Sequence, residues 1–374
     1  MVEVQDILLA YGDDYLAKHT LTPQQQKAFD DIRACRTVVL GGHIDLCPEC
    51  GEQYQSYNSC RNRHCTKCQA LRREEWVTRE GRDLIGVGYY HLVFTVPHEL
   101  NPVFYRNQRE MYNLLFRCSW ATVAAFAADP KYLGARTGAI SVLHTWGRQV
   151  QYHPHVHMIV PAGGLTERGG WRHTGKNFFA PVRAMSKVFR AKLLEGVRAL
   201  AGKLDLGGCA AHLAEPGALE SLVSSLFESK WVVYCKRPFA GASSVLAYLG
   251  RYTHRVAISN SRILSMEGGM VTFTYWSKGR KGTCTVTAEE FIRRFLMHVL
   301  PKGLAKVRHY GILASRDKRA RLAHIRRLTR TPEPAPLPDR DELVRKMIGR
   351  DPRLCRKCGS TLWRNYKTLE PQLC

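Results

Sequence analysis

The feature that most constrains the fold is the run His153–Val160, with the sequence His-Pro-His-Val-His-Met-Ile-Val. Its apolar and β-branched residues predict a strand. Successive side chains of a strand point to opposite faces, so His155 and His157 share one face, roughly 6.6 Å apart at about 3.3 Å per residue. Val156 then faces a core. Two imidazoles side by side on one face suit a divalent metal, although three satisfied or solvated histidines are the alternative.

The segment before this strand predicts the fold class. Residues Ala139–Trp146 form a second expected strand, and the short turn Gly147–Gln151 joins the two. Strands with so short a connection pair antiparallel. Helical patterns lie on both sides in the sequence, so we expect an α+β protein with a central antiparallel sheet and flanking helices, preceded by a small zinc-binding module.

The charge points to a polyanionic partner. The chain has 374 residues, with 56 Lys and Arg against 32 Asp and Glu, and a net charge of +24. Such an excess repels itself unless a polyanion offsets it, so nucleic acid is the leading partner. A membrane partner is disfavoured because no apolar run of about 18 residues occurs. The first residues carry acids and lack a signal pattern, so we expect a cytoplasmic protein.

Cysteine spacing predicts structural zinc. The chain has 13 cysteines, which in a reducing compartment indicate metal ligands and free thiols. The pattern Cys47-x2-Cys50-x14-Cys65-x2-Cys68 predicts one tetrahedral zinc site. Whether there are one or two zinc ions stays open, because four more potential ligands lie nearby: Cys35, His43, Cys60 and His64. The tail pair Cys355 and Cys358, with Cys374, is either half a zinc ribbon or an isolated knuckle.

Two tyrosines and several basic residues complete the candidate site. Tyr248 and Tyr252 lie four residues apart in an expected helix, Ser243–Arg255, and so share one of its faces. A tyrosine hydroxyl can attack a phosphodiester that a metal polarises, although ordinary core packing would also explain the pair. The residues expected to contact DNA are Arg61, Arg63, Arg251, Arg255, Lys278, Arg280 and Lys281.

Four segments carry a family resemblance. Tyr152–Leu165 resembles the His-hydrophobic-His motif of HUH endonucleases. Tyr57–Gln69 resembles the zinc-binding head of insertion sequence 91 family transposases, Tyr248–Asn260 resembles their catalytic tyrosine block, and Glu290–Tyr310 resembles their C-terminal segment. The resemblance spans roughly residues 35–315 in the family's order. The zinc head and the tyrosine block are specific, whereas a bare His-Val-His is not.

The resemblance implies a rolling-circle type transposase that acts on single-stranded DNA at transposon ends through a 5′-phosphotyrosine. It assigns Tyr248 and Tyr252 as nucleophiles, and His155 and His157 as ligands of Mg²⁺ or Mn²⁺. The candidates for a third ligand are His153, Gln149, Gln151 and His254. Further candidate partners are a second copy of the chain and host replication proteins.

The resemblance also gives a domain division. We expect a helical segment at 1–34, a zinc-binding domain at 35–80, an HUH-type tyrosine nuclease domain at 85–265, a basic DNA-binding extension at 266–330, a proline-rich linker at 331–340 and a tail with Cys-x-x-Cys at 341–374. The alternative functions are a plasmid replication initiator or relaxase, a histidine-triad nucleotide hydrolase, and a non-catalytic zinc-ribbon DNA-binding protein.

Overall fold

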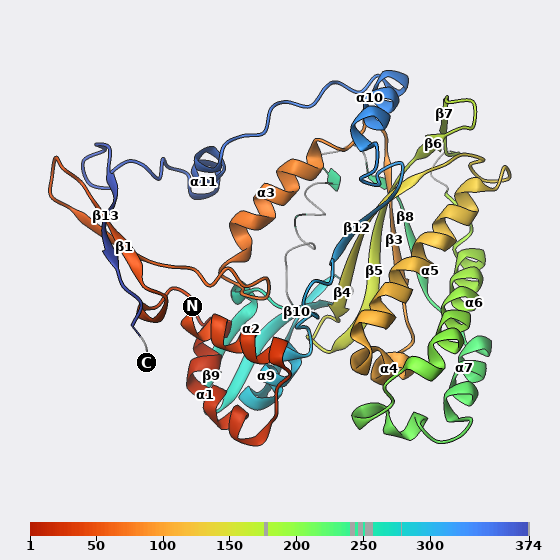
Figure 1. Cartoon of the computed structure of the whole chain (residues 1–374), viewed down its shortest axis with the longest axis horizontal. Coiled ribbons are helices and arrows are strands. Elements are labelled where there is room, and N and C mark those ends of the chain that lie inside the picture. The colour runs from red at the N-terminus through yellow and green to blue at the C-terminus, as the bar shows by residue number, and fades with distance from the viewer. Residues whose placement is uncertain (176–178, 240–243, 246–249, 251–256, 278, 373–374) are drawn as a thin grey trace.

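The centre of the protein is a five-stranded antiparallel sheet (Figure 1). The computed structural model describes residues 1–175, 179–239, 244–245, 250, 257–277 and 279–372. The strand order is β12-β4-β5-β3-β8. The predicted α+β class with a central antiparallel sheet is confirmed. The strands are β3 (Tyr89–Thr95), β4 (Gly138–Trp146), β5 (Tyr152–Pro161), β8 (Val233–Phe239) and β12 (Val307–Gly311).

Helices cover one face of this sheet (Figure 1). On β5, the side chains of Val156, Met158 and Val160 are fully buried in the core beneath these helices. Phe94 of β3 packs there against Phe189, with ring centroids 5.0 Å apart. Strand alternation therefore turns the intervening histidines of β5 to the opposite face. The helices are α4 (Asn101–Arg106), α5 (Gln108–Ala128), α6 (Val182–Leu200) and α7 (Ala218–Glu228).

A second core joins the beginning of the chain to residues near position 290. Ile7 and Phe29 of the first two helices pack with Phe273 and Phe291, all fully or almost fully buried. The second helix begins directly after Thr22, because the Thr22 hydroxyl caps it and accepts from the Gln25 amide at 3.3 Å. The elements are α1 (Val4–Lys18), α2 (Pro23–Ala34), β9 (Ile263–Glu267), β10 (Met270–Ser277), β11 (Arg280–Thr287) and α9 (Ala288–Leu296).

The segment 35–80, called the zinc module below, lies beside this second core (Figure 1). The C-terminal tail of the chain returns to the zinc module. Strand β13 pairs with β1 to give the order β13-β1-β2, and α11 packs against α3. None of the described helices combines the length and apolar character that crossing a bilayer requires. The remaining elements are β1 (Gly42–Leu46), β2 (Gln53–Tyr57), α3 (Gln69–Gly81), β6 (Gly163–Leu165), β7 (Trp171–His173), α10 (Lys318–Thr329), α11 (Arg340–Ile348) and β13 (Trp363–Leu369).

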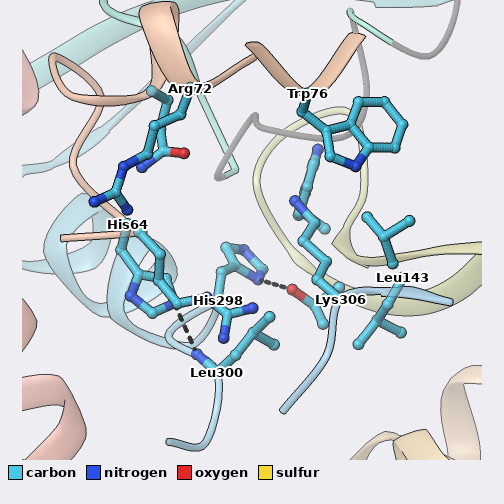
Figure 2. Close-up of a pocket in the computed structure, with 12 residues that line it drawn as sticks. His64, Arg72, Trp76, Leu143, His298, Leu300 and Lys306 are labelled. Carbon is cyan, nitrogen blue, oxygen red and sulfur yellow. Dashed lines mark hydrogen bonds between the residues drawn. The ribbon is translucent and has the colours of Figure 1, made fainter. Parts of the chain in front are cut away.

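Two buried histidines attach the zinc module to the central sheet. The Leu300 amide donates to His64 Nε2 at 3.0 Å, and His298 Nε2 donates to the Val150 carbonyl at 2.9 Å. The Thr145 hydroxyl lies 3.1 Å from His298 Nδ1, which accepts from it. Figure 2 shows both rings at the wall of a cavity of about 260 Å³ between α3 and β4. Burial lowers the pKa of His64 to about 3 and that of His298 to about 4, so both are neutral at pH 7.

Acid should therefore destabilise the fold through this junction. Between pH 6.5 and 4 the unfolded chain protonates His64 and His298 while the folded chain does not, so stability falls as pH falls through that window. Each group changes the unfolding free energy by up to ~1.4 kcal/mol per pH unit. Urea denaturation from pH 7.5 to 4.5 measures the slope. His64→Gln should reduce the slope, whereas exposed His98→Gln should leave it unchanged; an unaltered slope in His64→Gln would contradict the assignment.

Candidate metal sites

Three histidines converge on the face of the central sheet that lies opposite the helices α4 to α7. His144 of β4 stands directly opposite His155 of β5, and Val142 stands opposite His157. One ring nitrogen from each of the three histidines lies within 4.8 Å of the other two. Cross-strand neighbours on one face are close enough for such contact. The geometry suits a single divalent cation held by three imidazoles.

The third histidine is His144, which the sequence prediction missed, and not His153. His144 pairs with His155, and the next pair along is Trp146 with Tyr152. One residue separates these pairs on β4, whereas two residues separate them on β5, so β5 bulges at His153-Pro154. Proline has no amide hydrogen to donate, which explains a bulge at this point. The bulge removes His153 from the histidine group.

Neighbouring groups fix how the ligand rings face. His155 Nδ1 donates to the His153 carbonyl at 2.7 Å. His157 Nδ1 lies 2.8 Å from His91 Nε2 on β3, and the two rings are parallel, with an interplanar angle of 1°. Each bond holds the ring through its δ nitrogen and so sets the direction in which the ring faces. Sequence reasoning missed His91, which contacts His157 from β3.

Burial keeps these rings in the form that binds metals. It lowers the pKa of His155 to about 4, that of His91 to about 4, and that of His157 well below its usual value. All three are therefore neutral at pH 7, and neutral imidazole is the ligating form. Among the described residues, the histidine group contains no carboxylate. A bound cation would keep coordination positions free for water or phosphate oxygens.

Eight of the described cysteines form two groups of four, and the predicted grouping is wrong. Cys47, Cys50, Cys65 and Cys68 do not share one site. One group is Cys35, Cys60, Cys65 and Cys68, in which three sulfur pairs lie 3.5, 3.6 and 3.7 Å apart. The other is Cys47, Cys50, Cys355 and Cys358. A tetrahedral zinc with bonds of about 2.3 Å places its sulfurs about 3.8 Å apart, so both groups fit zinc.

The remaining predicted zinc ligands have other contacts. His64 belongs to the junction between the zinc module and the central sheet, and His43 lies 3.9 Å from the Asp45 carboxylate. Both are outside the two cysteine groups. One sequence signal could have separated the knuckles: Cys50 and Cys358 are each followed by glycine, whereas Cys68 is followed by Gln69, which begins α3. The two Cys-x-x-Cys turns that are followed by glycine are the ones that share a cysteine group.

The other predicted residues divide into three sets. Arg61, Arg280 and Lys281 are exposed. Arg63 is half-buried and donates to the Leu304 carbonyl at 2.9 Å. Gln151 Oε1 accepts from the Gln149 backbone amide at 2.9 Å, in the turn before β5. The residues outside the described part of the chain are Tyr248, Tyr252, Arg251, His254, Arg255, Lys278 and Cys374.

Comparison with known proteins defines the class as a transposase. A family model described as "Putative transposase" matches residues 138–321, which include all three histidines. A second model, "Transposase zinc-binding domain" of insertion sequence 91 type, matches residues 7–96. The conjugative relaxase TrwC in complex with oriT DNA aligns over 64% of this chain and 71% of that chain, at 11% identity and a TM-score of 0.25, too low to support any argument.

Two relatives align over almost the whole chain. "Putative transposase y4qJ" from Sinorhizobium fredii is 41% identical over 95% of this chain and 92% of its own length. The transposase for insertion sequence element IS801 from Pseudomonas savastanoi pv. phaseolicola is 28% identical over 88% of this chain and 80% of its own length. The chain belongs to the insertion sequence 91 family of transposases. This membership favours the transposase over the replication initiator, the relaxase and the nucleotide hydrolase.

The histidine assignments predict graded effects on metal affinity. Titration of Mn²⁺ by calorimetry should show weaker binding by about 10- to 100-fold for His91→Ala, because it removes the bond that orients His157. His144→Ala should weaken binding further, because it removes a ligand. His153→Ala is the matched control and should bind Mn²⁺ like the unaltered protein. A larger loss in His153→Ala than in His144→Ala would reverse our assignment of the third ligand.

Proposed function

We propose that this transposase cuts and rejoins single-stranded DNA at the ends of its element through a covalent 5′-phosphotyrosine, in rolling-circle type transposition. The observation that carries the proposal is the group of His144, His155 and His157 on the face of the sheet opposite the helices α4 to α7. A Mg²⁺ or Mn²⁺ ion held by these nitrogens would polarise a phosphate oxygen and stabilise the charge that develops on it. The chain itself supplies the ligands, the nucleophile and the DNA-binding surface.

Tyr248 and Tyr252 are the proposed nucleophiles. The hydroxyl oxygen of one tyrosine attacks phosphorus, the bond to the 3′ oxygen breaks, and the proton lost by tyrosine balances the proton gained by the free 3′ hydroxyl. The reverse reaction, in which a 3′ hydroxyl attacks the phosphotyrosine, rejoins a strand without an external energy source. Two such tyrosines provide attachment for two strand ends in turn.

The described residues around Tyr248 in the sequence support the proposal. Val245, three residues before Tyr248, is fully buried in the same apolar cluster as Ile159. Ile159 shares one face of β5 with His157, because the two are two residues apart in one strand. Gly250 lies between the two tyrosines in sequence, and a Cβ at this glycine would lie 3.1 Å from Val77 of α3.

A basic hairpin offers a surface for the DNA strand. Arg280 and Lys281 are exposed where β10 turns into β11. Trp276 pairs with Lys281 across the hairpin and keeps 62% of its surface exposed. Cations contact phosphates and aromatic rings stack on bases, a combination typical of single-stranded DNA binding.

Replacing the tyrosines tests the covalent step. Tyr248→Phe and Tyr252→Phe should each impair strand transfer, and the double variant should form no covalent adduct. The assay incubates the protein and Mn²⁺ with labelled single-stranded oligonucleotides from the element ends, and maps the adduct by mass spectrometry. Exposed Tyr366→Phe is the control. An adduct that persists in the double variant would refute the assignment and direct attention to Tyr234, whose ring lies 6.3 Å from that of His91.

Different substitutions should impair DNA binding and DNA cleavage. His157→Ala should abolish cleavage and leave DNA affinity nearly unchanged, because the affinity comes from the basic surface. Arg280→Ala combined with Lys281→Ala should weaken binding and flatten its salt dependence, by a slope of about 0.7 for each phosphate that the variant no longer neutralises. Fluorescence anisotropy at several salt concentrations measures both effects. A comparable loss of affinity in His157→Ala would show that the histidines bind DNA directly.

A further inference from the structure

Two Cys-x-x-Cys turns from opposite ends of the chain have the same backbone structure. The Gly51 amide donates to the Cys47 carbonyl at 2.9 Å, and the Gly359 amide donates to the Cys355 carbonyl at 3.1 Å. Each first cysteine also donates its amide to the carbonyl five residues later, at 2.9 and 2.8 Å. The two glycines have φ of 71° and 79°, a conformation that glycine adopts without strain.

These turns bring four sulfurs to one point. Cys47 and Cys358 Sγ atoms lie 3.4 Å apart, and those of Cys50 and Cys355 lie 3.7 Å apart. These separations are close to the edge of about 3.8 Å in a tetrahedral zinc–thiolate site. Each end of the chain supplies two of the four ligands.

Polar groups around the sulfurs complement the charge of such a site. The Tyr54 hydroxyl lies 3.3 Å from Cys355 Sγ, and the Lys357 amide donates to the same sulfur at 3.4 Å. The Lys357 ammonium pairs with Glu52 at 3.3 Å, which links the two turns. Four thiolates around Zn²⁺ carry a net negative charge, and donors of this kind orient and stabilise the ligands.

The buried apolar surface of this region is too small to hold the C-terminal tail in place by itself. The core of this region has three buried members, Cys47, Cys355 and Leu362. Strand β13 is exposed along almost its whole length, although it pairs with β1. A region this small, with so little buried apolar surface, depends on a cross-link or a metal for its stability.

We propose that a second zinc ion, held by Cys47, Cys50, Cys355 and Cys358, joins the two ends of the chain and makes the C-terminal tail part of the zinc module. The matching family models end at residues 96 and 321, before the tail cysteines. The site closes a loop of about 300 residues around the catalytic sheet. It fixes β13 beside β1, on the same side of the molecule as the contact between α11 and α3 (Figure 1).

Zinc stoichiometry of the full chain tests this proposal without reference to catalysis. Elemental analysis should find two zinc ions per unaltered chain. The double variant Cys355→Ser with Cys358→Ser should contain one, and so should Cys47→Ser with Cys50→Ser. Exposed Cys209→Ser lies outside both groups and should keep two. Two zinc ions in the tail variant, or one in the unaltered protein, would overturn the proposal.

A conservative variant tests the same site even if the cysteine variants misfold. Tyr54→Phe keeps all four sulfurs and removes the hydroxyl bond to Cys355. Chelator competition should then show one of the two zinc ions bound about 10-fold more weakly, as expected for loss of a group that supports a ligand. Tyr57→Phe, on the same strand, is the control and should keep both affinities. An unchanged affinity in Tyr54→Phe would argue against the site, as would two disulfides in place of zinc by intact mass under non-reducing conditions.

Discussion

The register between β4 and β5 is the constraint on which the histidine site depends. It places His144 opposite His155, and the bulge at Pro154 preserves that pairing while it removes His153. A slip by one residue would turn His155 and His157 into the helix-covered core and expose Val156. The same alternation that buries Val156, Met158 and Val160 therefore presents the ligands. The core and the site are specified by one pattern.

Contacts between distant segments place the zinc module beside this sheet. His64 accepts from the Leu300 amide, and the first helices share a core with Phe273 and Phe291. The four-cysteine group of Cys35, Cys60, Cys65 and Cys68 stiffens the segment that carries His64 and leads into α3. A zinc ion in this group would thus support the segment that contributes His64 and α3 to the wall of the cavity.

Much of this architecture could be predicted from the sequence. Strand alternation predicted that His155 and His157 share one face, the short turn predicted antiparallel pairing, and cysteine spacing predicted zinc. The errors in the predicted metal sites share one cause. Each missed residue comes from a different strand or segment than the residue that it contacts. His144 and His91 stand on neighbouring strands, and the partners of Cys47 and Cys50 come from Cys355 and Cys358. Two sequence signals pointed to such partners: the hairpin register pointed to His144, and the glycine that follows both Cys50 and Cys358 pointed to the tail cysteines.

The sequence by itself determined the kinds of ligand, their faces on each strand, the excess of positive charge and the family. These properties are local or additive, because periodicity and composition need no knowledge of distant contacts. Only the tertiary structure decided which ligands share a metal. That choice depends on distances between segments up to about 300 residues apart, and strand register, a bulge and the return of the C-terminal tail set those distances.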